Sequence, residues 1–203
     1  FMKWVAKYTE NRYTHVAILI YMEQLGGAGN LEKYPMVWEV SDNGTTFLRF
    51  IDWLDFTQDC DYSWVSLPLT PEQTKECRAY VFDKLAVDTD YDKSFSDEKK
   101  DYCTKSVCEM FLKAAGIRVQ DPVMLKDLLS RYIDKYHAKQ TPLARELRKK
   151  LIFGLLTLGN WLCKKATRGE YGIPLNKPLY FWGSPQNGGM CAYFSKEGRY
   201  GLR

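Results

Sequence analysis

Three apolar segments in the first quarter of the chain predict an antiparallel sheet. Residues 14–21 form a run of β-branched and apolar residues between polar stretches, and this run indicates a central strand. A second strand is predicted over Met36–Val40, followed by Ser-Asp-Asn-Gly and then by a third strand over Thr45–Phe50. An Asn-Gly pair between two such runs is a strong signal for a tight turn, so we expect the last two strands to form a hairpin.

Helical patterns follow these strands. Thr70-Pro71-Glu72-Gln73 is a capping box with proline at the first helical position, and the helix that it opens is expected to reach about Leu85. A second helix is predicted from Cys103 to Gly116, and a third from Asp121-Pro122. Residues 52–61 read as a connection, and 63–67 as a fourth strand. Strands followed by helices indicate the α+β class, with an antiparallel sheet packed on helices.

The composition changes after residue 140, so two parts are expected. Residues 1–140 hold the predicted sheet and helices, and residues 141–203 hold a basic amphipathic helix and a small accessory extension rich in Gly, Pro and aromatics. The apolar run from Leu151 to Leu162 is shorter than the about 20 residues that a transmembrane helix needs. It can be an interfacial helix on a membrane or a helix buried against the domain or a partner, and the packing interpretation is favoured.

Charge and residue counts limit the functional classes. The net charge is only +4, and no continuous basic face appears outside 145–165, so no nucleic-acid partner is expected. The six cysteines include no CxxC pair, which disfavours a zinc knuckle and favours a reducing, cytoplasmic compartment, with membrane association left open. With two histidines in the chain, a metal-dependent hydrolase is disfavoured, and we expect no cofactor and no metal.

Three residues have the chemistry of a thiol hydrolase. Cys103 follows a polar run and lies at the first turn of its predicted helix, where free amides and the helix dipole favour a thiolate. His15 begins the first predicted strand, and Glu39 is a carboxylate inside an apolar strand, where it needs a partner. Taken alone, Cys103 is more often a small core residue and His15 a satisfied strand-end histidine.

Two neighbours of Cys103 on the same predicted helix also bear on the chemistry. Cys108 is a rival nucleophile, but it lies inside the helix, where no free amides assist it. Lys105 is about 200° around the helix from Cys103, so it is expected to face away from the site.

The order of several short motifs adds a family resemblance. The motifs are Tyr13–Ile18, Val37–Val40, Tyr91-Asp92 with Phe95, Tyr102–Val107 and Ala114–Ile117. Their order resembles that of the permuted papain-like hydrolases of the NlpC/P60 superfamily, in the YiiX-like branch, where the histidine strand precedes the cysteine helix. The resemblance covers about residues 10–130. The chain departs from it at Lys105, where many members have glutamate, and residues beyond 140 have no counterpart.

The resemblance implies a permuted papain-like fold and a Cys–His–Glu triad. Cys103 would attack a carbonyl, His15 would exchange protons and Glu39 would hold the His15 ring. The implied enzyme is a thiol hydrolase or acyltransferase, a peptidase, amidase or lipid acyl hydrolase that cleaves an amide, ester or thioester bond. Its expected partners are a peptide, protein or lipid acyl substrate and, through 145–165, a membrane surface. The alternative is a catalytically inactive papain-like binding module whose C-terminal extension is a partner surface.

Overall fold

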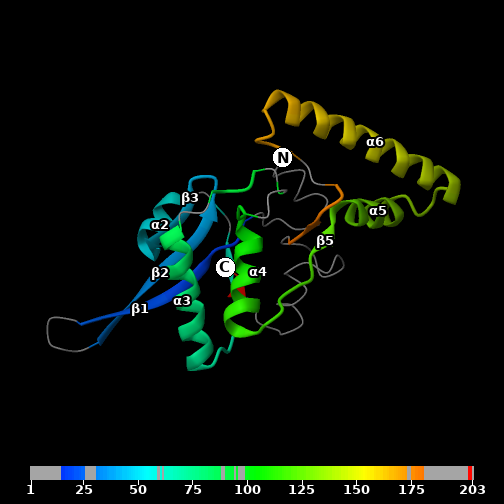
Figure 1. Cartoon of the computed structure of the whole chain (residues 1–203). Helices are drawn as coiled ribbons and strands as arrows, with labels where there is room; N and C mark the ends of the chain where they lie inside the picture. Colours follow the sequence, from blue (N-terminus) through cyan, green and yellow to red (C-terminus); the bar gives the residue numbers. More distant parts are fainter. Residues whose placement is uncertain are drawn as a thin grey trace. The chain divides into compact units, whose positions relative to one another are not determined.

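Figure 1 shows a computed structural model of the chain. It describes residues 15–25, 31–58, 60, 62–87, 90–93, 95, 99–172, 175–180 and 201–202. Contacts group the described residues into two compact units. The sheet unit takes those within 15–91 and 99–119 together with 201–202, and the helical unit takes those within 92–95 and 120–180. The division at residue 140 remains a prediction.

The sheet unit is built on three antiparallel strands in the order β1-β2-β3. They are β1 (Ile18–Leu25), β2 (Leu31–Ser41) and β3 (Gly44–Arg49). The predicted hairpin is present, and Gly44 at its turn has a φ of +92°, a conformation that glycine adopts without strain. The segment predicted as a central strand lies at an edge of the described sheet instead, because β2 pairs with strands on both sides.

Three helices belong to the same unit: α2 (Phe50–Phe56), α3 (Pro71–Val87) and α4 (Cys103–Ala115). Figure 1 shows α3 and α4 side by side. Side chains alternate across β2, so Trp38 and Glu39 face opposite sides of the sheet. Trp38 is fully buried and meets Tyr80 of α3 edge-on at 6.5 Å between ring centroids. The core therefore lies between the Trp38 face of the sheet and α3.

The predicted helix ends are confirmed for α3 and α4. Thr70 Oγ1 accepts from the Gln73 backbone N–H at 3.2 Å, and the Gln73 side chain accepts from the Thr70 N–H at 3.0 Å, which completes the capping box. Gly116 ends α4 with a φ of +68°, the left-handed conformation of a C-cap. The predicted fourth strand is shorter than expected, since only Ser63–Trp64 (β4) pair, with Gly201–Leu202 (β7).

The helical unit contains α5 (Leu125–Tyr136) and α6 (Pro142–Ala166). The helix predicted from Asp121-Pro122 begins later, because Val123–Met124 (β5) pair with Pro178–Leu179 (β6). Thr141 caps α6, and none of the α6 side chains is buried. Among the described residues, no helix has the length and apolar character needed to cross a membrane.

Candidate active site

The β1–β2 pairing brings His15 and Glu39 together. Ile18 lies opposite Trp38, so the chain just before β1 runs beside the Glu39 end of β2. His15 Nε2 lies 2.9 Å from Glu39 Oε2, with 37% of the His15 side chain and 17% of the Glu39 side chain exposed. The carboxylate inside an apolar strand thus has an imidazole as its partner, at a distance typical of a charge-assisted hydrogen bond.

Two further side chains hold the Glu39 carboxylate. Trp53 of α2 donates from Nε1 to Oε2 at 3.1 Å, and Thr46 of β3 donates from Oγ1 to Oε1 at 3.5 Å. Sequence reasoning missed both. Thr46 could have been found from the predicted turn, because a two-residue loop after Ser41 sets Thr46 opposite Glu39. Trp53 could not, because residues 52–61 were predicted as a connection, whereas residues 50–56 form α2.

Cys103 is the first residue of α4 and is buried. The preceding Tyr102 has extended backbone, and its side chain makes no capping hydrogen bond to the helix. The Cys103 thiol also acts on the His15 ring, and this interaction raises the pKa of His15. The three residues predicted from sequence therefore lie near one another, since Cys103 and Glu39 both act on the His15 ring.

The surroundings of His15 favour its charged form. Burial alone would lower the pKa of His15, but hydrogen bonding and charge interaction with Cys103 and Glu39 outweigh it and raise the pKa from 6.5 to about 10. The hydrogen bond from His15 lowers the pKa of Glu39, against the opposing effect of burial, and the bonds from Trp53 and Thr46 act in the same direction. At neutral pH the imidazole is therefore protonated and the carboxylate ionised.

Comparisons with known proteins place the chain in a family. Residues 3–149 match the family described as "Permuted papain-like amidase enzyme, YaeF/YiiX, C92 family". The chain belongs to this family. The matched span includes His15, Glu39 and Cys103, and membership gives the permuted papain-like fold of the α+β class and the broad class of a cysteine hydrolase.

Among solved structures, the chain is similar to the metalloprotein YiiX from Escherichia coli O157:H7. It is 23% identical to this chain, the match covers 70% of this chain and 77% of YiiX, and the TM-score is 0.47. No curated protein matches the chain.

The other cysteines of this YaeF/YiiX family member lie in different surroundings. Burial, with the charges of Cys103 and Glu109 nearby, strongly raises the pKa of the Cys108 thiol. Burial also raises the pKa of Cys77 on α3, with a further contribution from Glu76. Cys60 is exposed, Cys163 is half-buried, and Cys191 lies outside the described residues. A raised pKa disfavours the thiolate, so these surroundings are consistent with ranking Cys108 below Cys103 as a nucleophile.

Lys105 turns back toward the segment before α4. Its Nζ donates to the Lys100 carbonyl at 2.6 Å and lies 3.4 Å from Asp101 Oδ1. Asp101 is buried and also accepts from Lys84 Nζ of α3 at 2.6 Å. The Lys105 side chain therefore contacts the segment before α4 and stabilises the start of the helix, and it does not project into solvent.

The part of the chain that the structure describes also bears on metal binding. Within that part of the chain, no group of three or more His, Cys, Asp or Glu side chains could hold a metal ion.

Proposed function

We propose that the protein is a thiol hydrolase in which Cys103 is the nucleophile, His15 the proton carrier and Glu39 the residue that orients the imidazole. The observation that carries this proposal is the position of His15, which is hydrogen bonded to Glu39 at 2.9 Å and whose pKa is raised by both Glu39 and Cys103. A nucleophile, a base and a third group that orients the base are the parts required for covalent acyl transfer.

In the first step the Cys103 sulfur, as the anion of a thiolate–imidazolium pair, attacks the substrate carbonyl carbon. The carbonyl oxygen takes the negative charge as the tetrahedral intermediate forms. The Cys103 backbone N–H at the start of α4 is the donor that we assign to this oxyanion, assisted by the positive end of the helix dipole.

In the second step the intermediate collapses, and the bond between the carbonyl carbon and the leaving amine, alcohol or thiol breaks. His15 gives its proton to that leaving group, which leaves an acyl thioester on Cys103. Neutral His15 then removes a proton from water, which attacks the thioester and releases the acid. With another acceptor in place of water, the same steps transfer the acyl group.

Glu39 fixes the ring of His15 throughout. Its two oxygens are held by donors from three places, the chain before β1, β3 and α2, so the carboxylate has little freedom to turn. A fixed carboxylate keeps one ring nitrogen occupied and leaves the other directed at the sulfur. The proposed substrates are peptides, proteins or lipids that carry an amide, ester or thioester carbonyl.

Alkylation and turnover test this proposal together. Iodoacetamide at pH 6 should label Cys103 faster than the exposed Cys60, and Cys60→Ser should leave the fast phase unchanged. In a panel of peptide amide, acyl thioester and phospholipid ester substrates, the wild type should turn over at least one. Cys103→Ala should abolish that turnover, whereas Cys108→Ala should retain it.

The opposite results would remove the mechanism. If Cys103 reacts no faster than Cys60 and no substrate is cleaved, the chain is better described as an inactive papain-like binding module. Turnover that survives Cys103→Ala would assign the chemistry to another group.

A further inference from the structure

The outward side of α6 carries a continuous stripe of large apolar side chains. We call these residues the leucine face: Leu143, Leu147, Leu151, Leu155, Leu158, Trp161 and Leu162. Steps of three or four residues keep them on one side of a helix. Each is between 51% and 71% exposed. From Leu143 to Leu162 the stripe spans roughly 28 Å, at the rise of an α-helix.

Contacts on the other side of α6 fix this orientation. Lys149 Nζ donates to Asp134 Oδ2 of α5 at 2.8 Å, and its side chain is only 12% exposed. Phe153 and Leu156, on the same side as Lys149, are half-buried. The packing that the sequence favoured for this helix therefore occupies one face only, and the leucine face is directed outward.

Basic side chains accompany the leucine face. The helix has six of them and a single acidic residue, Glu146. The basic residues are Arg145, Arg148, Lys149, Lys150, Lys164 and Lys165. Arg148 and Lys150 are exposed at the two edges of the stripe, and Lys165 Nζ lies 5.2 Å above the Trp161 ring. An apolar face with cations along its edges complements a surface that is apolar inside and anionic at its rim.

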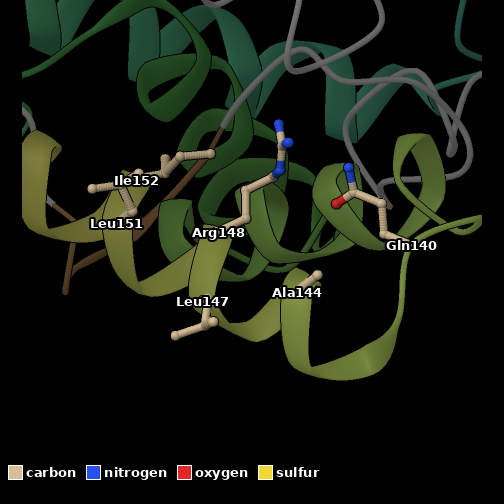
Figure 2. Close-up of a pocket in the computed structure, with 6 residues that line it drawn as sticks. All are labelled: Gln140, Ala144, Leu147, Arg148, Leu151 and Ile152. Carbon is tan, nitrogen blue, oxygen red and sulfur yellow. The ribbon is translucent and has the colours of Figure 1, made fainter.

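A pocket beside the first half of the leucine face combines the same two properties. It is lined by Gln140, Ala144, Leu147, Arg148, Leu151 and Ile152. Figure 2 shows Arg148 and Gln140 extending to one side of the helix while Leu147 points to another. Arg148 Nη1 lies 3.4 Å from His137 Nε2. A cation and an amide beside leucines can contact a phosphate group and the start of an acyl chain together.

We propose that the leucine face of α6 docks on an anionic phospholipid bilayer, with the helix lying in the plane of the membrane surface. The seven apolar side chains would enter the boundary between headgroups and acyl chains, and the flanking cations would meet lipid phosphates. The main rival occupant is a second copy of the chain. Pairing two leucine faces would bring the cationic edges of both helices together, which opposes that arrangement. The proposal is independent of the chemistry at Cys103.

Vesicle flotation of the full chain tests this docking. Wild-type protein should float with vesicles of phosphatidylcholine and phosphatidylserine and should remain in the dense fraction with phosphatidylcholine alone. Leu151→Glu combined with Leu155→Glu should lower the bound fraction roughly tenfold or more, because two apolar side chains of the docking face are lost. Leu112→Glu makes the same change at an exposed leucine of α4 and should leave flotation unchanged.

A second variant keeps the apolar face intact. Lys150→Gln with Lys165→Gln should weaken binding to anionic vesicles by roughly fivefold for each removed cation. Circular dichroism and thermal melts establish that each variant folds, and this charge variant tests the proposal even where the leucine variant does not fold.

Several outcomes would overturn the proposal. These are absence of flotation with anionic vesicles, equal flotation with neutral vesicles, and flotation that persists in both α6 variants. Light scattering can give a further outcome that would contradict the proposal. If the wild type is a dimer and Leu151→Glu with Leu155→Glu makes it a monomer, the leucine face is occupied by a second copy instead.

Discussion

At the scale of single residues, His15 is the centre of the candidate site because Cys103 and Glu39 both act on its ring. Loss of water around the ring disfavours its charge, yet the contacts with Cys103 and Glu39 raise its pKa to about 10. The imidazole is therefore a proton donor at rest, which suits protonation of a leaving group. It becomes a base only after it has given that proton away.

Proton NMR can measure the pKa of His15 directly, because the chain has only two histidines. We expect the His15 ring to titrate near pH 10, with the signal assigned by its persistence in His137→Gln. Glu39→Gln and Cys103→Ser each remove a partner that favours the imidazolium, so each should lower the midpoint toward 6.5. A midpoint near 6.5 in the wild type would contradict the contacts described for this ring.

In the proposed mechanism, we expect Trp53 to position Glu39, to which its indole N–H donates. Trp53→Phe keeps an aromatic ring in contact with Phe50 and Tyr62 but removes the N–H that bonds Glu39 at 3.1 Å. A hydrogen bond to a charged group contributes about 1.5–3 kcal/mol, so we expect kcat to fall on the order of 10-fold, with KM little changed. The His15 midpoint should shift as well, which a purely structural role would not produce. Trp64→Phe, at an exposed position, serves as the control.

At the scale of elements, features that depend on neighbouring residues could be predicted, whereas the pairing of strands and the packing of helices on the sheet could not. The hairpin, the capping box and Gly116 depend on neighbouring residues, and all three are confirmed. The helix α2 was missed because seven residues with few helical signals gain stability from packing on the sheet. The edge position of β1 depends on which strands pair, and no periodicity within β1 encodes that choice. The family motifs nevertheless pointed to the three candidate residues. Glu39 and Cys103 lie on elements that were predicted correctly, whereas His15 lies just before β1, which begins at Ile18 and not at residue 14.

The start of α4 offers an element-scale prediction. Lys105→Gln removes the charged contacts to Asp101 and to the Lys100 carbonyl, and we expect the free energy of unfolding to fall by about 1–3 kcal/mol in urea titrations. Lys113→Gln is the matched control on the same helix, because its pair with Glu109 is exposed and should contribute less than about 1 kcal/mol. Equal losses in the two variants would show that the Lys105 contacts do not fasten the helix.

At the scale of the whole molecule, the two units carry different physical properties. The sheet unit holds the polar contacts among His15, Glu39 and Cys103. The helical unit holds α6, whose apolar face finds no cover among the described residues. The family match ends at residue 149, so most of α6 lies beyond the matched span. Catalysis and membrane docking are thus proposals that can fail separately.

The ionisation of Glu39 and His15 also makes the global stability of the protein depend on pH. The pKa of Glu39 is lowered on folding. Its contribution to the free energy of unfolding is therefore present above pH 4.5 and is lost as the pH falls through the lowered pKa of the folded state. The pKa of His15 is raised, so its contribution is complete below 6.5 and is lost as the pH rises through about 10. The difference in unfolding free energy between wild type and Glu39→Gln should therefore be largest between pH 4.5 and 6.5. Glu32→Gln, at an exposed position on the same strand, should show no such window, and a difference independent of pH would rule out the ion pair as its source.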